Sequence, residues 1–520
     1  MDILKRIAEY AKRDGKRIAF KSRKGEINYQ QLWDISGRIA CMIQDLMQDD
    51  KEPVIVYGHK DPLMIACFIA CVRSGRAYCP VDVNTPTDRM RGIVEKIGNP
   101  LVVLVEGAGL SMGIEESKKF GGARWIVDNE TISEVLKHEP SDVELVQCKG
   151  DDNFYIIFTS GTTGTPKGVQ ITSDNLNNYL KWAVTLAGGI EEHSYFLNQA
   201  PYSFDLSVMD LYLSLATGGT VISVDSELQK QSGELMKYLT ENEINYWVST
   251  PSFSSVCLAE KDFNGLNLPG IKSFLFCGEP LLNSTALELI NRFPNSNVIN
   301  TYGPTESTVC VTEIKIDAEM ASRSEPLPVG KVKEGSEIIL DEKTSEIIII
   351  GDTVSPGYYK EPDLNSNSFF IVDLLLHGKD AGVASTYKSP AIARAYRTGD
   401  KGHFGSDGLL YCDGRLDNQI KLHGYRMELE DIESNLEKIP GVIRGTVAAR
   451  WTFGRADYLT AFIIRDETLI EGDYLGRKRI REAMRKVMPS YMVPKRVIFV
   501  DELPMTVNGK LDRNKLKEMA

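Results

Sequence analysis

The first two thirds of the chain alternate short apolar runs with amphipathic segments. The runs PVIVYG (53–58), NPLVVLVEG (99–107) and GTVISVD (219–225) have the length and β-branched content of buried strands. Helical periodicity lies between such runs, as in QLWDISGRIACMIQDL at 31–46. Strands that alternate with helices in this way predict parallel α/β layers.

After about residue 330 the pattern changes to short strands and turns, as in SEIIIIGDTVSPGYY and GLLYCDGR, which predicts a β-rich section. An amphipathic helix is then predicted at 430–439, followed by the strands VIRGTVAARW and YLTAFIIRD and a second helix at 477–488. These last elements predict a small α+β domain. The stretch 373–395 has little periodicity and is predicted to be an exposed insertion.

Composition indicates an ordinary globular protein. Of the 520 residues, 42% are hydrophobic and 25% charged, and the net charge of −12 argues against general nucleic-acid binding. The nine cysteines form no CxxC pair, which favours reduced thiols. The N-terminus has no apolar signal core, and the longest apolar stretch, 63–72, is too short to cross a bilayer. We therefore expect a cytoplasmic protein without membrane insertion, and a monomer by default.

The C-terminal fifth differs in charge from the rest of the chain. Residues 417–520 contain 19 Lys and Arg against 16 Asp and Glu, a net +3 within a chain of −12. Between Arg477 and Lys486 there are six basic residues and a single acidic one, Glu482. This basic run is either a solvated helix face or a docking site for an acidic partner.

The string YIIFTSGTTGTPKG at 155–168 predicts a phosphate-binding loop. Gly161, Gly164 and Gly168 let backbone N–H groups approach an anion, and the hydroxyls and one ammonium add donors. A Walker A loop needs Gly-Lys-Ser/Thr, whereas here Pro166 precedes Lys167 and Gly168 follows it. An ordinary surface loop is the alternative, since Gly, Thr and Ser are common loop residues.

Five further strings follow this loop in order. They are NQAPYSFDLS (198–207), NTYGPTES (300–307), YRTGDKG (396–402), GRLDNQIKLHGYRMELEDIE (414–433) and NGKLDR (508–513). Together with the loop they resemble the ordered motifs of the adenylate-forming superfamily, which includes acyl-CoA synthetases, luciferases and peptide-synthetase adenylation domains. NQAPYSFDLSVMDLY, STPSF, FCGEPL and NTYGPTESTV narrow the resemblance to the D-alanine:D-alanyl carrier protein ligases.

This resemblance implies a fold of two domains. A large N-terminal lobe at 1–416 combines α/β subdomains with the β-rich section, and a small mobile α+β domain at 417–520 follows. Asp417 corresponds to the hinge between them, where a few residues absorb the backbone change. After adenylation the C-terminal domain is expected to swing and to present the GYRMELEDIE side for thioester formation.

The resemblance also implies a reaction. D-alanine is activated with ATP as D-alanyl-AMP, pyrophosphate leaves, and the acyl group passes to the phosphopantetheine thiol of a D-alanyl carrier protein for teichoic-acid D-alanylation. ATP and Mg²⁺ are the implied cofactors. A carboxylate oxygen attacks the α-phosphate, so no protein nucleophile is required and catalysis depends on positioning and charge stabilisation.

Sixteen residues are implied at the nucleotide. They are Thr159, Ser160, Thr163, Lys167, Asn300, Thr301, Tyr302, Gly303, Pro304, Thr305, Asp400, Cys412, Asp413, Gly414, Arg415 and Lys510. Tyr302 is expected against the base, and Asp400 is expected to accept both ribose hydroxyls. Glu306 is the implied magnesium ligand, although a carboxylate at a helix N-terminus is an alternative. A turn aspartate is the alternative for Asp400.

Four residues are implied at the amino acid: Asp205, Cys277, Val309 and Lys510. Asp205 is expected to bind the substrate ammonium, which distinguishes amino-acid from fatty-acid activation; an N-cap is its alternative role. Cys277 and Val309 are expected to border the methyl group, which suits a small soft side chain such as cysteine. Lys510 is expected to bridge the substrate carboxylate and the α-phosphate, where the alternative is a solvated lysine near the chain end.

Two other functions stay open. One is an adenylation domain for another small amino acid, and the other is a non-catalytic nucleotide-binding homologue. The second is disfavoured because a decayed homologue could lose Lys167, Glu306, Asp400, Arg415 or Lys510 without unfolding, and all five are present.

Overall fold

The computed structural model describes residues 1–98, 100–105, 124–127, 130–131, 145–160, 166–373, 392–422, 424–452, 455–466, 473–505 and 511–520. Contacts divide the chain into two compact units. Unit 1 comprises 1–83, 97–157 and 168–414, and unit 2 comprises 84–96, 158–167 and 415–520. The last segment of unit 2 therefore begins close to the boundary predicted between 416 and 417, while two earlier segments join it.

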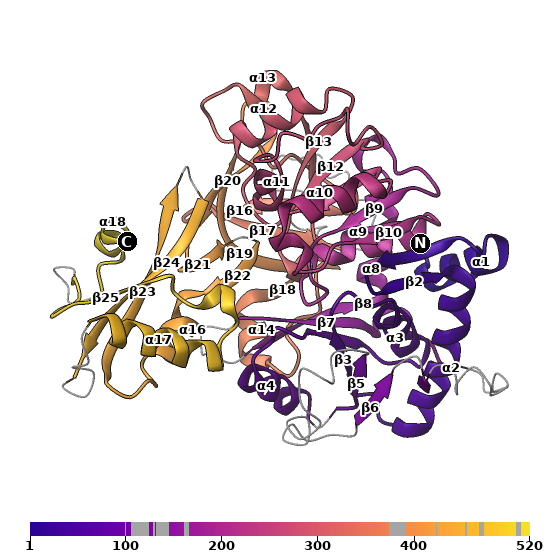
Figure 1. Cartoon of the computed structure of the whole chain (residues 1–520), viewed down its shortest axis with the longest axis horizontal. Helices are drawn as coiled ribbons and strands as arrows, with labels where there is room; N and C mark the ends of the chain where they lie inside the picture. The colour runs from indigo at the N-terminus through magenta and orange to yellow at the C-terminus, as the bar shows by residue number, and fades with distance from the viewer. Residues whose placement is uncertain are drawn as a thin grey trace. The chain divides into compact units, whose positions relative to one another are not determined.

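The larger sheet of unit 1 has nine strands (Figure 1). Its strands in spatial order are β15 (Lys331–Val332), β14 (Thr312–Ile316), β13 (Asn297–Tyr302), β12 (Ser273–Phe276), β11 (Tyr246–Ser249), β9 (Tyr195–Asn198), β10 (Thr220–Ser223), β1 (Ile18–Ser22) and β2 (Gly25–Asn28). Every pair from β13 to β1 is parallel, as the sequence predicts. The run predicted at 219–225 is β10.

The second large sheet of unit 1 has six strands. Their order is β6 (Arg124–Val127), β5 (Val102–Val105), β3 (Val54–Gly58), β4 (Tyr78–Asp82), β7 (Asn153–Thr159) and β8 (Lys167–Thr172). The pairs from β6 to β7 are parallel. Every residue of β3, β4 and β5 is buried, which explains why β3 and β5 are uninterrupted apolar runs in the sequence.

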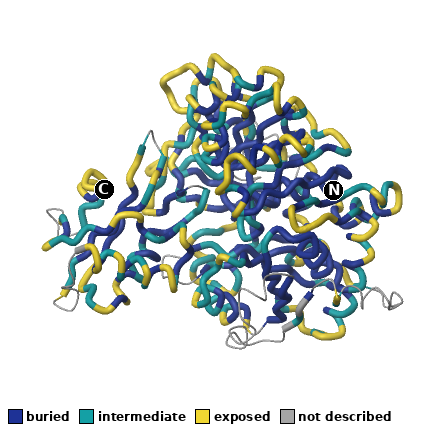
Figure 2. Tube along the Cα trace, viewed as in Figure 1, coloured by how far each residue is buried: buried dark blue, intermediate teal, exposed yellow. Residues whose placement is uncertain are grey.

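Helices cover these sheets. In unit 1 they are α1 (Ile3–Arg13), α2 (Tyr29–Met47), α3 (Pro62–Arg73), α8 (Ser173–Ala183), α9 (Leu206–Ala216), α10 (Ser232–Glu241), α11 (Pro251–Cys257), α12 (Asn283–Arg292), α13 (Ala318–Ala321) and α14 (Pro362–Ser368), with short 3₁₀ turns η1 (Leu186–Gly188), η2 (Leu228–Lys230) and η3 (Thr305–Ser307). Asn28 and Gln31 form a capping box at the start of α2. All residues of α3 and α9 are buried, and Figure 2 shows the centre of unit 1 in dark blue.

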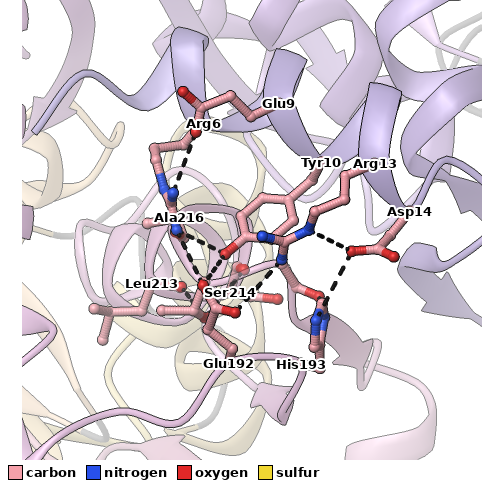
Figure 3. A network of polar contacts seen from close by, with 12 residues as sticks. Arg6, Glu9, Tyr10, Arg13, Asp14, Glu192, His193, Leu213, Ser214 and Ala216 are labelled. Atoms are coloured by element: carbon pink, nitrogen blue, oxygen red, sulfur yellow. Dashed lines mark hydrogen bonds and ion pairs between the residues drawn. The ribbon is translucent and has the colours of Figure 1, made fainter.

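A polar network ties α1 to the C-terminal end of α9 (Figure 3). Arg6 Nε donates to the carbonyl of Ala216 at 3.1 Å, and the Tyr10 hydroxyl donates to Glu192 at 2.8 Å. Burial and the Glu192 hydrogen bond raise the pKa of Tyr10 to about 12. Because Arg6 occupies one of the last carbonyls of α9, this network holds that end of the helix in place.

The β-rich section predicted after residue 330 is confirmed. It is a five-stranded antiparallel sheet of β16 (Ser336–Leu340), β17 (Glu346–Gly351), β19 (Ile392–Phe404) and β18 (Phe369–Asp373), with β20 (Leu410–Arg415) paired to β19. Asp373 pairs with Ile392, so 392–395 belong to β19. The predicted insertion of 373–395 is therefore wrong at both ends, since Asp373 ends β18 and 392–395 begin β19. The weak periodicity of the sequence here hid these strand ends. Residues 374–391 lie outside the described residues.

Unit 2 has an α+β composition. Its elements are α4 (Thr87–Ile97), β21 (Gln419–Leu422), β22 (Tyr425–Glu428), α16 (Leu429–Leu436), β23 (Val442–Thr452), β24 (Arg455–Arg465), α17 (Asp473–Val487), η5 (Ser490–Met492), β25 (Arg496–Phe499) and α18 (Arg513–Met519). The helices predicted at 430–439 and 477–488 are α16 and α17, and the predicted strands are β23 and β24. Across both units, the described residues contain no helix long and apolar enough to cross a bilayer.

Candidate active site

The carboxyl edge of the nine-stranded sheet collects several of the predicted site residues. Strands β9, β12 and β13 are part of one parallel array, so the segments that follow them leave the sheet at the same edge. Asp205 follows β9, Cys277 follows β12, and Gly303 to Glu306 follow β13. Ligands of open α/β sheets bind at this edge, which makes it the candidate active site.

Asp205 stands immediately before α9 without capping it. Within the described residues its side chain makes no capping hydrogen bond to the helix, so the N-cap role considered for this aspartate is wrong. A neighbour in the same unit is Tyr155, whose pKa is raised by burial and by the nearby Tyr78 and Asp205. The Tyr155 hydroxyl is buried and has no hydrogen-bond partner among the described residues.

Cys277 and Val309, which the resemblance implies at the amino acid, are in contact with each other. Cys277 is 3% exposed, and its thiol donates to the carbonyl of Val309 at 3.5 Å. Thr308 and Val309 have φ of +62° and +69°, which β-branched residues rarely adopt. Backbone strain of this kind persists where the surrounding structure imposes it, and it often occurs at functional sites.

Gly303 lies against this strained segment. A Cβ added at Gly303 would lie 2.5 Å from the Cα of Cys310 and 3.0 Å from the carbonyl oxygen of Val309. Both neighbours are backbone atoms, so neither can rotate away. The glycine therefore permits the close approach of the two segments.

We expect Gly303→Ala to destabilise the protein by about 1–3 kcal/mol, the usual cost of overpacking. The shifted Val309 carbonyl should also raise the KM for the amino acid. Thermal melting and substrate kinetics measure both effects. Gly233→Ala in α10 is the matched control, since an added Cβ there meets nothing within 4 Å among the described residues. Equal melting temperatures for the two variants would contradict the packing argument.

Tyr302 at the end of β13 and Asp400 on β19 are 98 residues apart in the sequence and in contact in the structure. The Tyr302 hydroxyl donates to Asp400 at 2.6 Å, and Asp400 is only 5% exposed. Burial, and next the Asp400 carboxylate, raise the pKa of Tyr302 well above its ordinary value. The tyrosine thus orients a buried carboxylate that can accept further hydrogen bonds.

The neighbouring motif residues have structural partners of their own. The Asn300 amide donates to the carbonyl of Pro328, and the Thr301 hydroxyl donates to that of Phe276, both at 2.8 Å. Pro304 and Thr305 are buried. On β20, Asp413 lies 2.8 Å from His403 Nδ1, next to the half-buried Cys412, while Gly414 has φ +110°. The side chains of Asn300, Thr301 and Asp413 are therefore held by partners within unit 1.

Glu306 is 1% exposed and accepts a hydrogen bond from the Tyr358 hydroxyl at 2.8 Å. Tyr358 in turn lies 3.3 Å from the Tyr396 hydroxyl. Neither tyrosine was predicted as a site residue, although Tyr358 lies in the string SPGYY and Tyr396 begins the motif YRTGDKG. No group of three His, Cys, Asp or Glu able to hold a metal occurs among the described residues. A single buried carboxylate fits Mg²⁺, which takes one or two protein carboxylates together with phosphate oxygens and water.

Thr159, Ser160 and Lys167, at the ends of β7 and β8 in the phosphate loop, belong to unit 2. The Ser160 hydroxyl donates to the carbonyl of Arg426 at 3.3 Å and accepts from the N–H of Glu428 at 3.2 Å. Lys167 Nζ lies 3.7 Å from Glu428, whose pKa is raised by burial although Lys167 and Arg426 oppose the shift. The Thr159 hydroxyl donates to the carbonyl of Lys167 at 3.5 Å. Thr163 and Lys510 lie outside the described residues.

Arg415 and Asp417 form an ion pair, with Arg415 Nε donating to Asp417 at 2.7 Å and its Nη2 donating to the second carboxylate oxygen. Burial alone would raise the pKa of Asp417, but the hydrogen bond from Arg415 holds it below its ordinary value. The predicted hinge residue is therefore paired with a predicted nucleotide ligand two positions earlier.

The AMP-binding enzyme family model matches residues 7–359, and the AMP-binding enzyme C-terminal domain model matches 431–510. A D-alanine--D-alanyl carrier protein ligase of Bacillus cereus is 40% identical over 99% of both chains. One from Bacillus anthracis is 39% identical over 99% of both chains. The chain belongs to the D-alanine--D-alanyl carrier protein ligase family of AMP-binding enzymes. As a member of that family it is an enzyme.

Solved structures share the fold. The Vibrio cholerae adenylation domain AlmE, in complex with glycyl-adenosine-5'-phosphate, aligns with a TM-score of 0.77 over 100% of this chain and 96% of its own, at 19% identity. ATP-bound MatB of Rhodopseudomonas palustris aligns with a TM-score of 0.66 over 100% and 98%, also at 19% identity. The expected fold of a D-alanine--D-alanyl carrier protein ligase, the adenylate-forming enzyme fold, is confirmed.

Proposed function

We propose that this enzyme activates D-alanine with ATP and transfers it to the phosphopantetheine thiol of a D-alanyl carrier protein for teichoic-acid D-alanylation. The main support is Asp205, a carboxylate that does not cap its helix and that follows β9 at the sheet edge where Cys277 follows β12 and Val309 follows β13. Asp205 is half-buried, and an ammonium ligand would compensate its partly desolvated charge. Relatives named D-alanine--D-alanyl carrier protein ligase support the choice of D-alanine.

In the first step we expect a carboxylate oxygen of D-alanine to bond to the α-phosphorus of ATP while the bond to pyrophosphate breaks. Asp205 holds the ammonium, and the Cys277 and Val309 wall leaves room for a methyl group. Asp400, oriented by Tyr302, accepts the ribose hydroxyls. When bound at Glu306, Mg²⁺ supplies positive charge to the phosphate oxygens.

In the second step the carrier thiol gives up its proton and its sulfur bonds to the D-alanyl carbonyl carbon, while the bond to AMP breaks. No thiol of this chain is required. We propose domains at 1–416 and 417–520, with Asp417 as the hinge, and the roles of Thr159, Ser160, Thr163, Lys167, Arg415 and Lys510 follow from the motif resemblance. Because ATP is the cosubstrate, we place the reaction in the cytoplasm.

Loading of a D-alanyl carrier protein tests the complete reaction. Incubation with ATP, Mg²⁺ and D-alanine should increase the intact mass of the phosphopantetheinylated carrier by one alanyl group. The carrier without phosphopantetheine is the control and should stay unmodified. An unchanged mass of the pantetheinylated carrier, with the protein folded, would contradict the proposed transfer.

Helix α17 suggests where the carrier docks. Lys478, Arg485 and Lys486 are exposed on this helix, and Arg477 and Arg479 are partly exposed. We expect a triple reversal of Arg477, Lys478 and Arg479 to Glu to raise the KM for an acidic carrier and to weaken its salt dependence, because complementary charge steers association. Pyrophosphate exchange, which needs no carrier, is the control and should not change. An unaltered KM for the carrier would contradict docking at α17 and would favour the alternative, a solvated helix face.

A further inference from the structure

Lys60 is a buried lysine that the proposed reaction does not use. It lies between β3 and α3, is 1% exposed, and has φ +51°. A buried ammonium is costly unless hydrogen bonds and opposite charge compensate it, and a left-handed backbone adds strain. Lys60 is therefore held in place by specific partners.

Among the described residues, the Lys60 ammonium donates its hydrogen bonds to the segment that leads to Asp205. The ammonium donates to the side-chain oxygen of Asn198 and to the carbonyl of Ala200, and it lies 3.5 Å from the carbonyl of Asn198. It also lies 4.9 Å from the centre of the Tyr202 ring, a cation–π distance. Residues 198–205 connect β9 to α9, so these contacts fix the first half of that connection.

Asn198, a hydrogen-bond partner of Lys60, also contacts two further elements. Its amide donates to Asp210 on α9 at 2.7 Å, and the Ser223 hydroxyl on β10 donates to its side-chain oxygen at 2.8 Å. Asp210 is fully buried and compensates the charge of Lys60. Through Asn198, the start of the connection is therefore attached to β10 and to α9. The C-terminal end of α9 is in turn held by the hydrogen bond from Arg6 (Figure 3).

We propose that Lys60 is a positioning residue for amino-acid recognition: by fixing the 198–205 connection it sets where Asp205 presents its carboxylate to the substrate ammonium. This inference depends on the proposed function of Asp205. It concerns only the amino acid, so ATP binding should be independent of Lys60.

The charge of Lys60 responds to pH near neutrality. Burial lowers its pKa from 10.5 to about 7, although nearby carboxylates oppose the shift. Burial also raises the pKa of Asp210. The charged and titratable groups that face or adjoin Lys60 are Asp210 on α9, Asp82 at the end of β4, Asp225 after β10, Tyr202 in the connection, and its chain neighbours His59 and Asp61.

The sign of the pH effect follows from this shift. Between about pH 7 and 10.5 an unfolded lysine is protonated whereas the folded Lys60 is neutral, so its contribution to the free energy of unfolding rises with pH. The ammonium that holds the connection is lost over the same range. A positioning role therefore predicts that D-alanine binding weakens while this stability contribution increases.

The test is ATP–pyrophosphate exchange with D-alanine for the wild type, Lys60→Met and Lys24→Met. Lys24 is the matched control, an exposed lysine whose ammonium donates to the carbonyl of His59. We expect Lys60→Met to raise the KM for D-alanine roughly 10- to 100-fold, as displaced binding groups do, with the KM for ATP unchanged. Lys24→Met should behave as the wild type.

The pH series completes the test, and its wild-type arm does not depend on the folding of any variant. From pH 6.5 to 8.5 the wild-type KM for D-alanine should rise, and Lys60→Met should lose this dependence. An unaltered D-alanine KM in Lys60→Met, or an equal rise in the KM for ATP, would overturn the inference, as would a flat wild-type profile. Absent exchange in the wild type would instead show that the proposed function is wrong.

Discussion

Asp205→Asn should abolish most D-alanine activation while ATP binding persists. Truncating one partner of a buried, hydrogen-bonded charge pair costs about 2–5 kcal/mol. This corresponds to a loss of roughly 30- to 5,000-fold in kcat/KM for D-alanine. The effect should appear in the KM for D-alanine more than in that for ATP, since the ammonium is the expected partner of this carboxylate.

Asp174→Asn is the control for this charge removal. Asp174 is an exposed aspartate in the first turn of α8, so it shares the helix N-terminal environment of Asp205 without lying at the candidate site. Its kinetics should match those of the wild type. If Asp205→Asn kept wild-type kcat/KM for D-alanine, the carboxylate could not be the ammonium ligand, and a substrate without an ammonium would become the better hypothesis.

Lys510→Ala should lower the rate of adenylate formation by roughly 10²–10³-fold, the usual effect of removing one preorganised electrostatic group. The prediction follows from the NGKLDR motif, in which the ammonium is expected to bridge the substrate carboxylate and the α-phosphate as charge builds between them. Pyrophosphate exchange measures this step. Transfer from supplied D-alanyl-AMP to the carrier measures the second step, which should be much less affected.

Lys517→Ala in the last turn of α18 is the matched control, an exposed lysine seven residues further along the chain. It should leave both steps unchanged. Equal losses of adenylation and transfer in Lys510→Ala would indicate a folding defect or a shared role. An unaffected exchange rate would leave Lys510 as a solvated lysine.

Local patterns predicted the elements but not the contacts between distant ones. The strands β3, β5 and β10 were predictable because strands buried on both faces are continuous apolar runs. The start of β19 was missed because 392–395 lie at the end of a weakly periodic stretch. The order of strands in the nine-stranded sheet, in which β1 and β2 join β10, depends on long-range packing that periodicity does not record.

The candidate site shows the same limit of sequence patterns. Motif resemblance predicts Asp205, Cys277, Val309, Glu306 and Asp400 as site residues, and the structure adds hydrogen-bond partners for Cys277, Glu306 and Asp400. Tyr358 and Lys60 were not identified, because their partners are 52 and 138 residues away along the chain. From the sequence alone a lysine is predicted to lie at the surface, because lysines are rarely buried. Only packing shows that it binds the connection before Asp205.

Activation of D-alanine is most directly tested by ATP–pyrophosphate exchange with a panel of D- and L-amino acids. The panel should include glycine, both alanine enantiomers and both serine enantiomers, with a fatty acid as a substrate that lacks the ammonium. We predict the highest kcat/KM with D-alanine and weak exchange with the L enantiomer. Strong exchange only with L-serine or the fatty acid would contradict the proposed substrate, and no exchange with any substrate would favour a non-catalytic nucleotide-binding role.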